Sequence, residues 1–143
     1  MGERIWVVKT NRTLQIDARR SLLEPLLDIF EQDLKKGNCP KDRIEEIRIA
    51  TEEIFINIAS YAYPDQDGEV SIEETVQDKK IDVTFADQGI PYNPLEKVDP
   101  DINLGFEERD IGGLGIYMVK KIVDQVDYQY KDGKNCLHIS CGW

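Results

Sequence analysis

Apolar residues along the chain follow two periods, a helical one in some stretches and strict alternation in others. The longest stretch with the helical period predicts a helix from Pro40 to about Ala62, because proline is tolerated in a first helical turn. The run from Pro64 to Gly68 then ends this helix. The residues on its apolar face are Ile44, Ile47, Thr51, Ile54, Ile58 and Ala62.

Two further helices are predicted, one on each side of it along the chain. Asp17 is a suitable N-cap for a helix over residues 18–36, and the Gly37-Asn38 pair is a signal that ends it. Residues 114–124 repeat the helical spacing of apolar positions near the C-terminus. The sequence therefore predicts three helices.

Strands are predicted where apolar and polar residues alternate. In the first of two neighbouring runs, Glu74 shares one face with three aliphatic residues, and the gap between the runs has hairpin length. Asp132-Gly133, a strong tight-turn dipeptide, joins the last two strands. The predicted strands are residues 4–9, with 13–16 as a possible partner, and then 70–76, 81–85, 126–131 and 136–141.

Residues 91–111 contain prolines, a glycine and many charges, with little periodicity. A segment of this length without an element is typical of a lid, which we expect over about residues 94–112. The order of the other elements predicts one α+β domain over residues 1–143. We expect a two-layer sandwich, with a mixed, mostly antiparallel sheet and three helices on one face.

Composition and charge narrow the class of protein. No apolar run approaches the roughly 20 residues needed to span a bilayer, and the N-terminus lacks the features of a signal peptide. Three cysteines, an odd number without metal-ligand spacing, favour a reduced, cytoplasmic protein. The net charge of −10 argues against nucleic-acid binding. An acidic surface suits a basic protein partner, or it serves only to keep the protein in solution.

Glu53 and Asn57 lie one helical turn apart, beside the apolar face of the predicted 40–62 helix. An asparagine amide oxygen is a neutral ligand that suits Mg²⁺, and a nearby carboxylate can take a proton from an attacking nucleophile. The alternative is a chance pair on a solvated helix. Glu52 is a second candidate carboxylate, but its spacing from Asn57 is not one helical turn.

Asp87, Gly89 and Pro91 follow the predicted 81–85 strand. A carboxylate at the end of a buried strand can accept a hydrogen bond from the exocyclic amine of adenine, a contact that guanine cannot make at that position. A glycine would let the backbone approach the base closely. The alternative is an ordinary turn at the end of a strand, for which Asp, Gly and Pro are common choices.

Gly112, Gly113 and Gly115 lie at the entry to the predicted 114–124 helix. Exposed backbone N–H groups and the positive potential of a helix N-terminus favour phosphate binding there. Close packing of the helix is the alternative explanation. The chain has neither a Walker A motif nor a kinase-type glycine-rich loop, so any phosphate chemistry must use a different arrangement.

Together, the order and spacing of these three motifs resemble the nucleotide site of the GHKL ATPases. Within that superfamily the chain is most similar to the anti-sigma factor serine/threonine kinases of the RsbW and SpoIIAB type. The likeness runs from about Thr10 to the C-terminus, and the second motif continues as Tyr92-Asn93-Pro94, as in the family. The resemblance implies the Bergerat ATP-binding fold, with ATP or ADP and Mg²⁺ as ligands.

Carried over residue by residue, the resemblance makes Glu53 the general base and Asn57 the Mg²⁺ ligand. It makes Asp87 the acceptor for adenine. In the lid, Arg109 is the candidate cation for the γ-phosphate, although a lone lid arginine is more often surface charge. The other residues expected at the nucleotide are Gly89 and Pro91 near the base, and Gly112, Gly113, Leu114, Gly115 and Ile116 near the phosphates.

Tyr61 departs from the family pattern, in which a histidine commonly follows the Asn57 position by one turn. Ala62 and Tyr63 follow as expected, so the alignment holds while the contribution of the histidine is missing. The single histidine, His138, falls in the last predicted strand, where we expect a sheet residue rather than a catalyst. The sequence therefore supports nucleotide binding more strongly than catalysis.

The resemblance implies a regulator with two protein partners. Such a protein phosphorylates a serine or threonine on a small antagonist protein and binds a sigma factor, and family members are commonly homodimers. Two other functions remain open from the sequence. One is a nucleotide-binding module that acts only by sequestering a partner, and the other is an ATPase without a protein acceptor.

Overall fold

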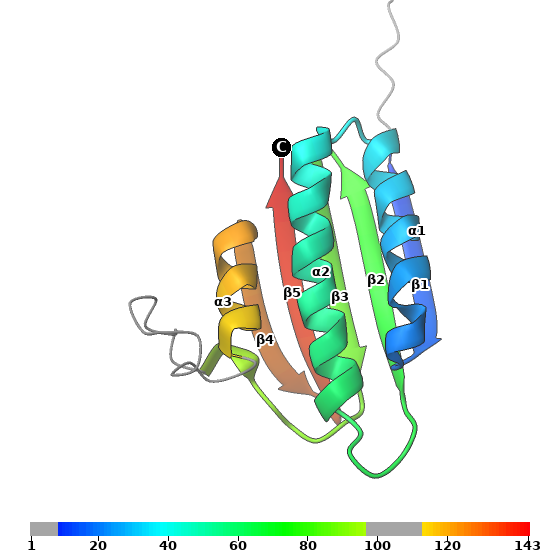
Figure 1. The fold of residues 1–143 in the computed structure, drawn as a ribbon, viewed down its shortest axis with the longest axis vertical. Helices are drawn as coiled ribbons and strands as arrows, with labels where there is room; N and C mark the ends of the chain where they lie inside the picture. The colour runs from blue at the N-terminus through cyan, green and yellow to red at the C-terminus, as the bar shows by residue number, and fades with distance from the viewer. Residues whose placement is uncertain (1–8, 97–112) are drawn as a thin grey trace, which may run out of the picture.

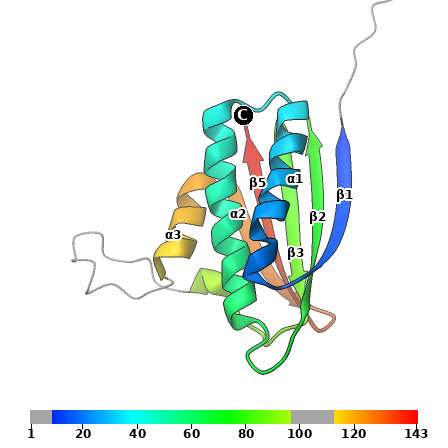
Figure 2. The same ribbon diagram turned by 45° about the vertical axis from the view of Figure 1, so that its right-hand side comes forward.

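The computed structural model describes residues 9–96 and 113–143, which form a five-stranded sheet with three α-helices on one face (Figure 1, Figure 2). The helices and the sheet are the two layers of the molecule, and the apolar residues between them form its core. The α+β two-layer fold predicted from the sequence is confirmed.

The sheet has the strand order β1-β2-β3-β5-β4, and each of its pairings is antiparallel. Within the described residues the sheet is therefore not mixed, because it contains no parallel pair. The register places Asp87 at the end of β3 opposite Asn135 at the start of β5. The strands are β1 Thr10–Asp17, β2 Glu69–Gln77, β3 Lys80–Asp87, β4 Gln125–Lys131 and β5 Lys134–Gly142.

Tight two-residue turns join β2 to β3 and β4 to β5. Asp132 and Gly133 have φ angles of 55° and 77°, and Asp78 and Lys79 have φ angles of 55° and 59°. Two consecutive residues in the left-handed region fit the twist of a two-residue hairpin. The tight turn predicted at Asp132-Gly133 is thus confirmed, and both turns fix the register of the strands that they join.

The helices are α1 Leu23–Lys36, α2 Lys41–Tyr61 and α3 Gly113–Ile122. The predicted start of the first helix was wrong, because Asp17 ends β1 and residues 20–22 form a short 3-10 turn. Pro25 explains the delay, since proline is tolerated only in the first turn of a helix. In the described part of the chain, no helix is both long and apolar enough to cross a membrane.

Two predicted segments lie partly outside the described residues. Of the predicted strand 4–9, the structure describes only Lys9, which precedes β1. β1 contains the other predicted N-terminal strand, 13–16, and pairs with β2. Of the lid expected over residues 94–112, the structure describes Pro94–Glu96, which form a short 3-10 helix, and not residues 97–112.

Large aromatic side chains from both layers meet in the core. Phe30 of α1, Phe55 of α2 and Phe85 of β3 are almost completely buried. Burial of a side chain of this size stabilises a fold by roughly 1.5–3 kcal/mol. Phe55 and Phe85 anchor α2 on the centre of the sheet, and α2 and β3 are the elements that carry Glu53, Asn57 and Asp87.

Candidate functional site

A cleft of about 820 Å³ opens between α2, α3 and one end of the sheet. Its walls also include residues 90–94, which follow β3, and side chains from β4 and β5. This volume is typical of a site for a small molecule of nucleotide size. Of the residues that the sequence predicted to bind nucleotide or to act in catalysis, those lining the cleft are Glu53, Asn57, Asp87, Gly115 and Ile116.

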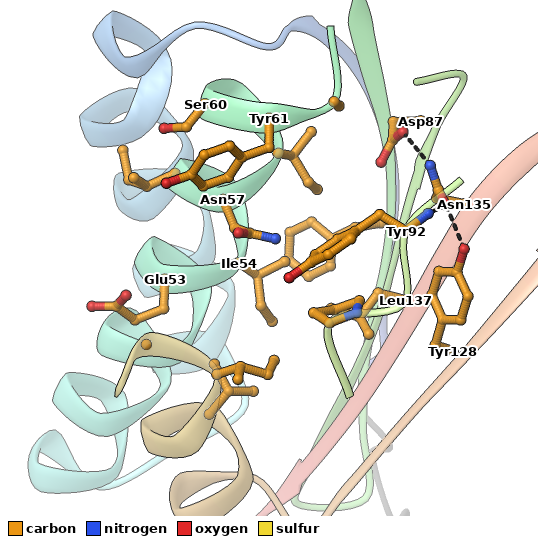
Figure 3. Close-up of a pocket in the computed structure, with 18 of the residues that line it drawn as sticks. Glu53, Ile54, Asn57, Ser60, Tyr61, Asp87, Tyr92, Tyr128, Asn135 and Leu137 are labelled. Carbon is orange, nitrogen blue, oxygen red and sulfur yellow. Dashed lines mark hydrogen bonds between the residues drawn. The ribbon is translucent and has the colours of Figure 1, made fainter. Parts of the chain in front are cut away.

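Glu53 and Asn57 reach the cleft from the same side of α2, because residues one turn apart share a helix face. Figure 3 shows the Asn57 amide pointing across the cavity toward the sheet, whereas the Glu53 carboxylate points away from it. Among the described residues, the Asn57 amide has no hydrogen-bond partner. Asn57 is therefore available to a ligand in the cleft.

The Glu53 carboxylate lies against the first turn of α3. A Cβ atom at Gly115 would come within 2.4 Å of Glu53 Oε2, so the glycine leaves the space that this carboxylate occupies. The pKa of Glu53 is raised, mainly because burial disfavours its charge and secondly because of the neighbouring Glu52. A carboxylate with a raised pKa is a better proton acceptor near neutral pH, as a general base requires.

Asp87 is buried at the end of β3, and one of its oxygens is held by the protein. Asp87 Oδ1 accepts hydrogen bonds of 2.9 Å from both Asn135 Nδ2 and the Gly89 backbone N–H. Within the described residues, Oδ2 has no hydrogen-bond partner. One acceptor of the carboxylate is thus left for a ligand in the cleft, which is what recognition of an adenine amine needs.

Asn135 connects Asp87 with two tyrosines (Figure 3). Its Oδ1 accepts hydrogen bonds from the Tyr128 hydroxyl and, at 3.0 Å, from the Tyr92 backbone N–H. Its Nδ2 also donates to the Ile90 carbonyl at 2.9 Å. Sequence reasoning assigned no role to Asn135 or Tyr128. A glycine-containing turn just before Asn135 was the available signal, but strand pairing was needed to bring the asparagine to Asp87.

Gly89 and Pro91 lie near the cleft without lining it. A Cβ atom at Gly89 would lie 2.2 Å from the Ala62 carbonyl oxygen, so the glycine is required for close packing on the C-terminal end of α2. The close approach predicted at Gly89 therefore exists, but its partner in the structure is protein backbone. Pro91 is exposed.

The glycine-rich motif is only partly described. Gly113 and Leu114 begin α3, and Gly115 and Ile116 follow them into the cleft wall. The N-terminus of α3 thus opens at the cleft, where a helix favours an anion. Arg109 and Gly112 lie outside the described residues.

Tyr61 occupies the position at which the resembled family commonly has a histidine. The Tyr61 side chain is 55% exposed and lines the cleft, so the cleft wall has a tyrosine where the family commonly has a histidine. His138 lies on the helix-free face of the sheet, where its ring nitrogens approach Asp82 at 3.2 Å and Asp127 at 3.4 Å. His138 is a sheet residue, as the sequence predicted, and it is remote from the cleft lining.

The side chains in the cleft fit an adenine nucleotide with Mg²⁺. Apolar walls from Ile54, Phe85 and Leu137 suit a base, and the free oxygen of Asp87 suits its amine. No group of three or more His, Cys, Asp or Glu residues that could hold a metal occurs in the described ranges. A metal here would depend on Asn57 and on the phosphates of the ligand, which is the usual way in which Mg²⁺ binds.

Comparison with known proteins finds relatives that are named serine-protein kinase RsbW. The chain is 31% identical to the protein from Bacillus cereus, 30% to that from Bacillus mycoides and 32% to that from a second strain of Bacillus cereus, each over 100 residues. Each match covers 67% of this chain and 62% of the relative. The chain thus matches less than two thirds of the length of these relatives.

A sequence profile of one domain family matches nearly the whole chain. The family is described as the histidine kinase-like ATPase domain, and the match covers residues 16–141. This range contains all of the cleft-lining residues, from Arg20 to Leu137. The fold, the cleft and the match agree, and the chain belongs to the histidine kinase-like ATPase domain family.

Proposed function

We propose that this protein is an ATP-dependent serine/threonine kinase that phosphorylates a small antagonist protein in a bacterial partner-switching system. The observation that carries the proposal is the meeting of Glu53, Asn57 and Asp87 in one cleft. The cleft thereby combines an acceptor for adenine, a ligand for Mg²⁺ and a base for proton transfer. The names of the serine-protein kinase relatives support the same activity.

Nucleotide binding uses the sheet side of the cleft and α3. Asp87 accepts a hydrogen bond from the adenine amine through Oδ2, and the segment with Gly89 and Pro91 lies beside the base. The N-terminus of α3, with the glycine-rich segment before it, binds phosphate. When bound, Mg²⁺ would be held by Asn57 and would supply positive charge that neutralises the phosphate oxygens.

Glu53 is the proposed catalytic base. It takes the proton from the serine or threonine hydroxyl of the antagonist as that oxygen attacks the γ-phosphoryl group. Its raised pKa supports this role, since an acceptor with an ordinary carboxylate pKa would bind the proton more weakly. Arg109 and Gly112 are proposed to contact the γ-phosphate from the lid.

The partners, the homodimer and the location are part of the proposal, and the family resemblance of the sequence supports them. The antagonist is the phosphoacceptor, a sigma factor is a second partner, and the working form is a homodimer in the cytoplasm. The net charge of −10 favours protein partners with basic surfaces over nucleic acid.

A second function is favoured by one observation, the exposed Tyr61 at the cleft wall where a histidine is common. If the histidine is needed for transfer, the protein is a nucleotide-binding module that regulates only by sequestering its partner. An ATPase without a protein acceptor is the third function, and it requires steady turnover of ATP by the isolated protein.

Calorimetric titration of ADP and ATP with Mg²⁺ tests the nucleotide site. We expect saturable binding to the wild type and binding at least about tenfold weaker to Asp87→Asn, which loses one charged acceptor. Asp127→Asn is the matched control, because Asp127 lies on the other face of the sheet beside His138. No binding of either nucleotide to the wild type would contradict the proposal.

Transfer of radiolabelled phosphate from ATP to a candidate antagonist tests the kinase. Glu53→Gln is expected to reduce transfer about a hundredfold or more while nucleotide binding persists, because only the base is lost. Glu52→Gln, its exposed neighbour, should keep nearly full transfer. Binding of nucleotide and antagonist without transfer would favour the sequestering module, and rapid ATP turnover without an acceptor would favour the ATPase.

A further inference from the structure

We propose that Asn135 and Tyr128 form a positioning network that orients Asp87 and thereby makes the cleft selective for adenine over 6-oxopurines. The inference rests on the proposed function, since it assumes that Asp87 binds the base. It adds two residues that do not contact the base themselves but determine how strongly Asp87 prefers adenine over a 6-oxopurine.

The amide of Asn135 has all of its hydrogen-bonding positions occupied. Nδ2 donates to Asp87 Oδ1 and to the Ile90 carbonyl, and Oδ1 accepts from Tyr92 N–H and from the Tyr128 hydroxyl. An asparagine amide offers two donors and two lone pairs, so this network uses every one. Asn135 is also buried, and a flipped amide would face its two donor neighbours with an NH₂ group.

Tyr128 adds a second hydrogen bond to the oxygen end of this amide from the neighbouring strand. The Tyr92 backbone N–H can only donate, so it requires the amide oxygen on its side, and the Tyr128 hydroxyl donates to the same oxygen. Burial raises the pKa of Tyr128 above its ordinary value of 10, at which the hydroxyl is already protonated at neutral pH. The NH₂ group must then point at Asp87.

The consequence at Asp87 is a carboxylate with a fixed plane. Two donors, Asn135 Nδ2 and Gly89 N–H, hold Oδ1 at 2.9 Å, and only Oδ2 has no partner among the described residues. A carboxylate free to rotate could accept from the 6-amine of adenine or from the N1–H group of a 6-oxopurine. A carboxylate held in one orientation accepts from one of these positions only.

The energetic basis is the cost of an unpaired polar group. A 6-oxopurine presents a carbonyl where adenine presents an amine, so a fixed Oδ2 would face a second acceptor. Sites that hydrogen-bond a substrate group strongly reject an analogue without it, because their own polar atoms are then left unpaired. Loosening Asp87 should therefore reduce discrimination more than it reduces overall affinity.

Titration of ADP and IDP into the wild type and three variants tests the network. ADP and IDP differ at the 6-position of the base, so their ratio of dissociation constants reports how strictly Asp87 is held. Tyr128→Phe removes one donor to Asn135, and Asn135→Asp replaces the donor to Asp87 by an acceptor of the same shape. Tyr130→Phe is the matched control, since Tyr130 lies on the same strand face, is exposed and has no described hydrogen bond.

We expect the preference for ADP over IDP to fall about threefold in Tyr128→Phe and about tenfold in Asn135→Asp, the scale of one hydrogen bond. Tyr130→Phe should keep the wild-type preference. Thermal unfolding of each variant identifies any loss of fold, and a folded Tyr128→Phe alone is sufficient for the test.

A pH series on Asn135→Asp gives a readout that a merely structural residue would not produce. Two adjacent carboxylates share a proton more readily as pH falls, and a protonated side chain at 135 can again donate to Asp87. Binding of ADP should therefore strengthen from about pH 8 to about pH 6 in this variant more than in the wild type. The titratable groups facing the pair are Tyr128 from β4 and Tyr63 after α2.

The possible outcomes separate this inference from the proposed function. If the wild type binds no ADP, the nucleotide site is wrong and the network inference is overturned with it. If the wild type prefers ADP and the folded variants keep the same preference, only the network inference is overturned. A reduced preference in both variants, with an unchanged Tyr130→Phe, supports it.

Discussion

Glu74 lies on the helix-facing side of β2 with no exposed surface. The nearby Asp33 of α1 is also fully buried, and each of its oxygens accepts a 2.9 Å hydrogen bond from Arg12. Arg12 Nε also lies 3.8 Å from Glu74 Oε2, so one guanidinium lies beside both carboxyl groups. Burial, and then Asp33, raise the pKa of Glu74 to about 9. Both Glu74 oxygens are buried without a hydrogen-bond partner among the described residues, which disfavours the charged form, and a pKa of about 9 makes the group neutral at pH 7.

Glu74→Gln is expected to flatten the dependence of stability on pH. The folded pKa of about 9 lies above the ordinary value of 4.5, so the unfolded chain releases this proton first as pH rises. The free energy of unfolding then falls between these two pH values, by at most about 1.4 kcal/mol per pH unit. Chemical denaturation of the wild type and Glu74→Gln over this range measures the difference.

Glu73→Gln is the control for this experiment, because Glu73 is the exposed neighbour on the other face of the same strand. It should retain the wild-type slope. An equally steep fall in stability in Glu74→Gln would mean that Glu74 is not the group responsible.

At the scale of elements, α3 is held at its C-terminal end by a single arginine. Arg43, in the first turn of α2, donates to the Ile122 carbonyl at 2.8 Å and to the Gly142 carbonyl at 3.0 Å. It also approaches Asp124 at 3.4 Å. Arg43 thus joins α2, α3 and the end of β5, and it satisfies a carbonyl that the end of a helix leaves open. The opposite end of α3 forms part of the cleft wall.

Arg43→Ala is expected to destabilise the fold by about 1–3 kcal/mol, because two partly buried carbonyls lose their donor. Arg19→Ala is the matched control, since its ion pair with Asp67 is largely exposed and should contribute little. Urea denaturation compares the two. Equal, small losses would show that α3 is held by its apolar contacts and not by Arg43.

The elements also differ in how well the sequence predicted them. α2 and the β2–β3 hairpin follow the prediction closely, because their periodicity is regular and proline or turn residues mark their ends. The start of α1 was wrong because a good N-cap residue, Asp17, was used instead as the last residue of a strand. The pairing of β1 with β2 outweighs the preference of Asp17 for a helix N-cap. The sequence around Asp17 does not indicate this pairing, because the partner strand lies far away in the chain.

At the scale of the molecule, the cleft is made by segments from the 3-10 turn at residues 20–22 to β5, so a bound nucleotide would bridge both layers. We expect ADP with Mg²⁺ to stabilise the folded protein by about 2.7 kcal/mol at a concentration about 100 times its dissociation constant. Thermal unfolding with increasing ADP measures this as a rise of several degrees in Tm. Asp87→Asn should need more ADP for the same rise, and no rise in the wild type would contradict nucleotide binding.

The sequence by itself determined the fold class, the family resemblance and the pairing of Glu53 with Asn57, since these depend on spacing within one helix or strand. It also indicated Asp87 through the motif that contains it. Only the tertiary structure decided that Gly89 packs on α2, that Asn135 donates to Asp87 and that Tyr128 donates to Asn135. The reason is that these contacts arise from strand register and helix packing, which join residues far apart in the chain and leave no periodic signal.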